Sequence, residues 1–186
     1  MSQGFVFKIT VVGDGAVGKT SLIQRFTKGE FNEEYIMTLG AQFTKFTEEV
    51  EGVPCELFIW DIAGQDTFAK LRQSFYKGSK AAIIVFSHED GKHGEESFKN
   101  IGEWYKDITK NVKNIPIVLF GNKIDLIDRE SLNNKDKTSS NANIELLKKK
   151  HDFGGYYLTS AFTGEGVTDA FKKLIRELYN KFSQNI

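Results

Sequence analysis

The sequence predicts an α/β fold in which a mostly parallel sheet is covered on both sides by helices. Short apolar stretches suited to strands alternate with longer stretches that carry apolar residues at helical spacing. Such alternation favours parallel strands joined by helical crossovers. The first apolar stretch, residues 5–12, also runs directly into a glycine-rich stretch, residues 13–20, which predicts a strand–loop–helix unit. At 186 residues the chain suits one domain, and we expect that domain to cover residues 1–186, with its core at about 5–182.

Six strands are expected from the apolar stretches, at residues 5–12, 41–50, 53–60, 81–87, 115–121 and 156–159. Glu51-Gly52 separates the second stretch from the third and is a hairpin signal. That pair should therefore be antiparallel, which places one antiparallel strand at an edge of the sheet.

About five helices are expected, at residues 18–27, 66–78, 95–111, 142–151 and along the C-terminal segment. The C-terminal segment has one apolar face, formed by Val167, Phe171, Leu174, Leu178 and Phe182. Two polar stretches, residues 87–96 and 128–143, are interpreted as surface insertions in loops.

Composition excludes several functional classes. The 25 basic and 25 acidic residues balance, so we expect no nucleic-acid partner. Cys55 is the only cysteine, which excludes an intrachain disulfide and suits a reducing, cytoplasmic location. The sequence contains no signal peptide, membrane span, myristoylation glycine or prenylation cysteine. We expect a monomer without a lipid anchor in this chain; a lipidated tail in a longer protein stays an alternative, so membrane contact is left open.

The glycine-rich stretch has the pattern G-x-x-x-x-G-K-[ST] and reads Gly13-Asp14-Gly15-Ala16-Val17-Gly18-Lys19-Thr20. Glycines let the loop wrap tightly, so that its backbone N–H groups point at phosphate oxygens, and the following helix adds its partial positive charge. Lys19 can reach the β- and γ-phosphates, and the Thr20 hydroxyl can bind Mg²⁺. This pattern predicts a nucleoside triphosphate site.

A second motif, Asn122-Lys123-Ile124-Asp125, follows the fifth apolar stretch and predicts which base is bound. The Asp125 carboxylate can accept hydrogen bonds from guanine N1–H and from its exocyclic amine, whereas adenine has neither donor there. An unsatisfied charged group costs a few kcal/mol, or about a hundredfold in affinity. Asn122 can brace the loop, and the Lys123 stem can cover the base.

With these motifs in this order, the sequence resembles the small Ras-like GTPases, and within them the Rab group, over about residues 5–182. Three further segments carry the resemblance: Trp60-Asp61-Ile62-Ala63-Gly64-Gln65, Tyr35-Ile36-Met37-Thr38-Leu39-Gly40 continuing to Phe43, and Thr159-Ser160-Ala161 followed by Thr163-Gly164. The resemblance implies a three-layer P-loop NTPase G domain that binds GTP or GDP with Mg²⁺ and hydrolyses GTP to GDP and phosphate.

The resemblance also implies a role for each matching residue. Thr20 and Thr38 would bind Mg²⁺, and Asp61 would do so through water. Gln65 would orient the attacking water, assisted by Lys19, Thr38 and Gly64. The nucleotide-binding set implied in this way is Asp14, Gly15, Ala16, Val17, Gly18, Lys19, Thr20, Ser21, Phe31, Tyr35, Thr38, Gly64, Asn122, Lys123, Asp125, Ser160, Ala161 and Phe162.

Within that set, several roles are specific. Phe31 would pack on the guanine, and Tyr35 would close over the phosphates. Ser160 would position Asp125, and the Ala161 N–H would contact the base oxygen.

The resemblance further implies a molecular switch. Residues 30–40 and 62–76 would become ordered with GTP, held by the γ-phosphate through Thr38 and Gly64. We expect slow hydrolysis, because no arginine is placed to enter the site from the same chain. A GTPase-activating protein, an exchange factor and effectors are the expected partners. Gly15 lacks a side chain and would leave room for a partner's arginine.

Three positions depart from the family pattern. Phe162 replaces a lysine beside the base, Ile62 replaces a threonine, and Met37 stands where Ras proteins have proline. Phe162 and Ile62 favour one alternative, a GTP-dependent binding module with negligible hydrolysis. A kinase of small substrates is a second alternative, but the polar insertion supplies only Arg129 for the arginine-bearing lid it would need.

Overall fold

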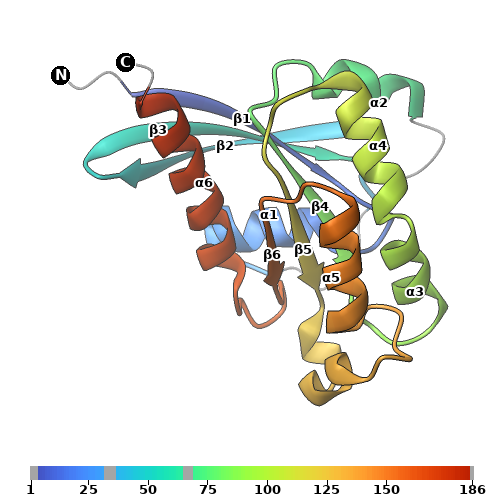
Figure 1. Ribbon diagram of the computed structural model, residues 1–186. Helices are drawn as coiled ribbons and strands as arrows, with labels where there is room; N and C mark the ends of the chain where they lie inside the picture. Colours follow the sequence, from blue (N-terminus) through green and yellow to red (C-terminus); the bar gives the residue numbers. More distant parts are fainter. Residues whose placement is uncertain (1–3, 32–36, 65–68, 185–186) are drawn as a thin grey trace.

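One six-stranded sheet organises the protein, in the order β2-β3-β1-β4-β5-β6 (Figure 1). This computed structural model describes residues 4–31, 37–64 and 69–184, without the side chains of 69–71. The strands are β1 (Phe5–Val12), β2 (Ala41–Val50), β3 (Val53–Ile62), β4 (Ala81–Ser87), β5 (Ile117–Asn122) and β6 (Gly155–Leu158). Only the β2–β3 pair in this sheet is antiparallel among the described residues, and β2 lies at the edge, as predicted.

The predicted hairpin joins β2 to β3. Glu51 has φ 53° and Gly52 has φ 77°, so both central residues adopt the left-handed conformation that a tight two-residue hairpin turn requires. Val50 then pairs directly with Val53. The local turn chemistry therefore determines the register of the antiparallel pair.

Six α-helices lie within the described residues: α1 (Lys19–Lys28), α2 (Ala69–Tyr76), α3 (Lys92–Lys99), α4 (Ile101–Asn111), α5 (Asn141–Lys150) and α6 (Val167–Ser183). Short 3₁₀ turns cover Ile124–Leu126 and Arg129–Asn133. The expected helix at 95–111 corresponds to α3 and α4, which are separated by a single residue, Asn100.

The two polar stretches are not simply loops, and this part of the sequence interpretation was wrong. Residues 87–96 contain the first half of α3, and residues 128–143 contain a 3₁₀ turn and the start of α5. The start of α3, before residue 95, was not predicted, because this helix buries Gly94 and Ser97 beside Phe98 and its inner face has almost no apolar periodicity. A Cβ atom on Gly94 would lie 1.9 Å from the Glu89 carbonyl oxygen, so only glycine permits this close approach.

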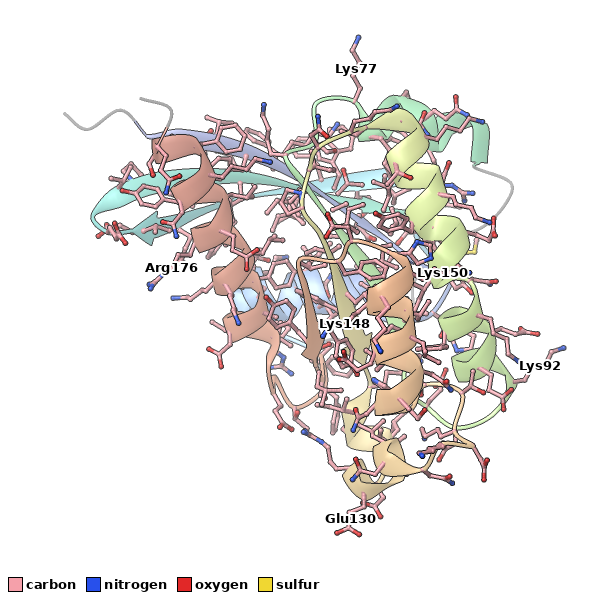
Figure 2. The ribbon with its side chains drawn as sticks, viewed as in Figure 1. Lys77, Lys92, Glu130, Lys148, Lys150 and Arg176 are labelled. Carbon is pink, nitrogen blue, oxygen red and sulfur yellow. The ribbon has the colours of Figure 1, made fainter. Side chains whose placement is uncertain are left out.

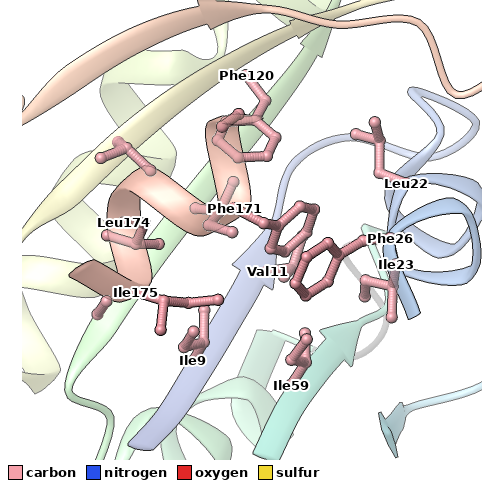
Figure 3. Packing of buried hydrophobic residues seen from close by; sticks show 14 of the residues in the cluster. Ile9, Val11, Leu22, Ile23, Phe26, Ile59, Phe120, Phe171, Leu174 and Ile175 are labelled. Carbon is pink, nitrogen blue, oxygen red and sulfur yellow. The ribbon is translucent and has the colours of Figure 1, made fainter. Parts of the chain in front are cut away.

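Helices cover both faces of the sheet and form two hydrophobic clusters. On one face, α1 and α6 pack together through Phe26 and Phe171, whose stacked rings lie 4.4 Å apart (Figure 3). Phe120 of β5 meets the edge of the Phe171 ring at 5.3 Å. Residues of α2, α3, α4 and α5 form the second cluster on the opposite face. The result is the expected three-layer arrangement.

None of the helices in the described residues is both long enough and apolar enough to cross a membrane. Most of the residues that the sequence motifs single out lie in or next to the loops that follow β1, β3, β5 and β6, whereas Phe31 and Thr38 lie between α1 and β2. Because β1, β3, β4, β5 and β6 run parallel, these loops meet at one edge of the sheet.

Candidate functional site

The glycine loop, residues 13–18, connects β1 to α1 in a conformation that depends on its glycines. Gly13 has φ 140° and Gly18 has φ 98°, a region that residues with side chains rarely adopt. A Cβ atom added to Gly13 would lie 2.1 Å from the Val85 carbonyl oxygen. A Cβ atom added to Gly18 would lie 2.3 Å from Asn122 Nδ2. A Cβ atom at Gly15 would meet nothing within 4 Å among the described residues. The two outer glycines are therefore required by the fold, whereas Gly15 borders open space.

Lys19 begins α1, and its side chain folds back over the glycine loop. Its ammonium donates hydrogen bonds to the carbonyl oxygens of Gly13 (2.8 Å) and Asp14 (2.7 Å). Burial lowers the pKa of Lys19 to about 8, although Asp61 and Asp14 act in the opposite direction. An ammonium has three donors, so one remains available to an anion held by the loop.

Three oxygen-bearing side chains converge beside Lys19. The Thr20 hydroxyl donates a hydrogen bond to Asp61 Oδ2, and the Thr38 hydroxyl lies 3.3 Å from the same oxygen. The two hydroxyl oxygens are 3.1 Å apart. Burial raises the pKa of Asp61, while the Thr20 bond and Lys19 lower it.

The other oxygen of the Asp61 carboxylate, Oδ1, is buried and has no hydrogen-bond partner among the described residues. A buried acceptor without a partner costs roughly 1–3 kcal/mol, which implies a ligand or water in the complete site. Mg²⁺ prefers hard oxygen ligands and retains several of its waters. Thr20, Thr38 and Asp61 therefore fit such an ion: two hydroxyls to bind it and one carboxylate oxygen to hold a bound water.

Gly64 packs directly against the glycine loop. A Cβ atom there would lie 2.4 Å from the Gly13 carbonyl oxygen and 2.6 Å from the Gly15 nitrogen. The backbone of the segment after β3 therefore touches the phosphate-binding loop. Gln65 and Tyr35 lie outside the described residues, so their predicted roles stay predictions.

Asn122, at the end of β5, links the two halves of the site. Its Nδ2 donates to the Val17 carbonyl oxygen at 2.9 Å, and its Oδ1 accepts from the Ala161 amide at 3.1 Å. The bracing contact expected of Asn122 is thus present. The Ala161 amide, expected to contact the guanine oxygen, donates to Asn122 instead, so a base oxygen would have to share it.

The base side of the site lies in the loops after β5 and β6. Ser160 Oγ donates to Asp125 Oδ1 at 2.5 Å, in the arrangement expected if Ser160 orients that carboxylate. Lys123 adopts the left-handed conformation, with φ 62°. Its ammonium lies 3.0 Å from Glu89 Oε2, a partner that the sequence did not suggest.

Two phenylalanines border the base side. The rings of Phe31 and Phe162 meet edge to face with centroids 5.3 Å apart. Phe162 is 54% exposed, so its ring could still contact a bound base. Replacement of the family lysine therefore adds an aromatic surface next to Phe31.

Arg25 of α1 holds these aromatic residues in place, a role absent from the sequence-based predictions. Its guanidinium donates to the carbonyl oxygens of Ala161 (2.8 Å), Phe162 (2.6 Å) and Gly29 (2.9 Å). Because all three acceptors are backbone atoms, no side-chain motif could have revealed the contact.

Asp14, another predicted site residue, directs its carboxylate away from the loop. Oδ1 accepts from Trp104 Nε1 and Oδ2 from Asn100 Nδ2, both at 2.7 Å. Only its backbone is left to face a phosphate. The remaining predicted positions, Ala16, Val17 and Ser21, lie in the glycine loop and in the first turn of α1.

Two departures from the family pattern can be placed. Ile62 is fully buried in the cluster beneath α2–α5, so it contributes to packing. Met37 is 44% exposed, next to Thr38.

Comparisons with known proteins agree with this geometry. A profile of the Ras family matches residues 8–180. The chain is 34% identical over 177 residues to Ras-related protein Rab-13 of Rattus norvegicus, covering 95% of this chain and 81% of the relative. It is 33% identical over 181 residues to Ras-related protein Rab-9B of Homo sapiens, covering 95% and 84%. A third relative, Ras-related protein Rab-9A of Rattus norvegicus, is 33% identical over 178 residues, covering 93% and 83%.

Proposed function

The chain belongs to the Ras family and is a Rab-like small GTPase, and on this premise we propose that it is a guanine-nucleotide switch that hydrolyses GTP to GDP and phosphate. The observation that carries the proposal is the buried Asp61 oxygen that has no partner within the described part of the chain, beside two threonine hydroxyls and a buried lysine. This arrangement suits a hydrated Mg²⁺ next to a phosphate. The Asp125–Ser160 pair on the base side supports guanine as the base.

Hydrolysis needs an oriented water and compensation of phosphate charge more than covalent chemistry. Mg²⁺, when bound, would neutralise charge on the β- and γ-phosphate oxygens. Lys19 would add its free donor, and Gln65 would orient the attacking water. The glycine-loop N–H groups would hold the phosphates throughout.

The switch itself would depend on the γ-phosphate. Thr38 precedes β2 and Gly64 follows β3, and Ala41 pairs with Ile62, so the open end of the hairpin lies at the phosphate site. Contacts from Thr38 and Gly64 to the γ-phosphate would order residues 30–40 and 62–76, and its loss would release them.

An exposed aromatic surface beside these segments supports effector binding. Leu39 is 68% exposed and Phe43 is 58% exposed. Phe43 stacks on Trp60 with ring centroids 5.5 Å apart, and Trp60 packs on Phe75 at 5.6 Å. Clustered apolar side chains on a surface mark interaction sites. A partner bound there would touch Leu39, one residue from Thr38, and could thus distinguish the two nucleotide states.

Family membership also supports a GTPase-activating protein and an exchange factor as partners. Unaided turnover should be slow, and a partner's arginine beside Gly15 could accelerate it by roughly 10³–10⁵-fold. The cytoplasmic location and the monomeric state stay predictions. The alternative of a GTP-dependent binding module with negligible hydrolysis loses one of the observations that favoured it, because Ile62 is buried in the core.

The test is to identify the nucleotide released from the purified protein and to time single-turnover cleavage of added GTP. We expect GDP or GTP, with slow Mg²⁺-dependent hydrolysis. Asp125→Ala should lower guanine-nucleotide affinity by about a hundredfold, because the base would lose its charged acceptor. Asp136→Ala, which removes an exposed carboxylate in the insertion, serves as the control. Bound adenine nucleotide, or phosphate transfer to an acceptor other than water, would contradict the proposal.

A further inference from the structure

The polar segment at residues 87–96 has no part in the proposed chemistry, yet it touches both halves of the nucleotide site. His93 of α3 places Nε2 2.8 Å from the Gly15 carbonyl oxygen, and its Nδ1 contacts Glu89 Oε1. The other Glu89 oxygen accepts from Lys123. A continuous polar connection therefore runs from the glycine loop through His93 and Glu89 to the base loop.

Both contacts of His93 are with hydrogen-bond acceptors, the Gly15 carbonyl oxygen and the Glu89 carboxylate. Burial disfavours ionisation of Glu89, but hydrogen bonds from His93 and Lys123 outweigh it and lower the pKa of this carboxyl. Glu89 is therefore an ionised acceptor that connects His93 to Lys123.

Other charged groups around this contact already have partners. On α3, Lys92 pairs with Glu96, and Glu95 pairs with Lys99. Across from α3, Asp14 accepts from Trp104 and Asn100, and Asp90 pairs with Lys137 of the second insertion. Among the described residues, the charges connected to His93 are thus Glu89 and, through it, Lys123.

We propose that Glu89 and His93 form a clasp that holds the glycine loop and the base loop together and slows release of guanine nucleotide. This inference rests on the proposed function. A nucleotide leaves when the loops holding its phosphates and its base separate, and the clasp opposes that separation.

The experiment measures release of a fluorescent GDP analogue, chased with excess GDP, at pH 7. Since the pair is partly exposed, we expect His93→Ala to release the analogue about three- to tenfold faster than wild type. His93→Lys should release it more slowly than His93→Ala, because an ammonium can donate to both acceptors.

Lys92→Ala is the matched control, because it lies next to His93 on α3 but points into solvent (Figure 2). It should retain the wild-type release rate. Glu89→Gln combined with His93→Ala should release no faster than the more affected single variant, since both changes break one connection.

Two outcomes would overturn the clasp, and only the second also overturns the proposed function. If His93→Ala binds GDP and releases it at the wild-type rate, the clasp is refuted while the proposed function stands. If wild type binds no guanine nucleotide, the proposed function is refuted and the clasp with it. Equal thermal unfolding of the variants at pH 7 would exclude a folding defect as the cause of faster release.

Discussion

Replacing Gly18 with alanine should damage both the fold and nucleotide binding, whereas the same change at Gly15 should leave the fold intact. The two glycines lie in one loop but differ in surroundings. At Gly18 the new Cβ atom would lie 2.3 Å from Asn122 Nδ2, and φ is 98°. At Gly15 the Cβ atom would meet nothing within 4 Å among the described residues.

The magnitude follows from two contributions. A residue with a side chain in this backbone region costs about 1–3 kcal/mol. Asn122 is buried and bonded to Val17 and Ala161, so relief of the contact breaks its bond to the Val17 carbonyl oxygen. Leaving that buried acceptor without a partner costs about 1–3 kcal/mol more. The sum, about 2–6 kcal/mol, is a large part of the roughly 5–15 kcal/mol that stabilises an ordinary domain.

The assay is urea unfolding of nucleotide-free protein together with a GDP titration, for wild type, Gly18→Ala and Gly15→Ala. Gly18→Ala should lower the free energy of unfolding by about 2–6 kcal/mol and weaken GDP binding. Gly15→Ala should stay within about 0.5 kcal/mol in unfolding. If both variants unfolded with the same free energy and bound GDP equally, the close contact between Gly18 and Asn122 would not constrain the loop, and the reasoning would be refuted.

Three further predictions concern other parts of the molecule. Gln65→Leu should reduce GTP turnover at least about tenfold and preserve nucleotide binding, because a general base or water-orienting group typically contributes at least that much to the rate. Unchanged single-turnover cleavage of GTP would count against the role assigned to Gln65. Arg25→Ala should speed GDP release, and Arg25→Lys should restore only part of the effect, because lysine lacks the planar fork that reaches several carbonyl oxygens; full rescue by lysine would contradict this account. Burial, with Lys137 and Arg129, lowers the pKa of His88 from 6.5 to about 3, so the folded form stays neutral while the unfolded chain binds a proton below pH 6.5. Stability should therefore fall as pH drops from 6.5 toward 3, and His88→Gln should lose about 3 kcal/mol less than wild type between pH 7 and pH 4 in urea unfolding; parallel losses would refute the His88 contribution.

The strands were predictable because each carries its own signal. Residues 81–87 form an unbroken apolar run and are buried throughout as β4. The Glu51-Gly52 turn specified an antiparallel pair from two residues. By contrast, the start of α3 was missed because Gly94 and Ser97 occupy its buried face, and small residues leave no apolar periodicity to detect.

The residues of the candidate site were also predictable only in part. The glycine loop, Lys19, Thr20, Asp61 and Asp125 were identified because each belongs to a short motif of neighbouring residues. The sequence did not reveal that Trp104 and Asn100 hold the Asp14 carboxylate, or that Glu89 pairs with Lys123. These partners are 34 to 90 residues apart in the chain and form no motif of fixed spacing.

By itself, the sequence determined the order of strands and helices, the phosphate loop and the choice of guanine as the expected base. Such features depend on local backbone preferences and on residues at short, fixed spacing. Only the tertiary structure decided that Asp61 has a buried oxygen with no partner among the residues the structure describes, that Arg25 anchors the base loop, and that His93 reaches Gly15. The physical reason is that these contacts join segments far apart in the chain. They depend on how the parallel strands bring their loops together at one edge of the sheet, which no short stretch of sequence reveals.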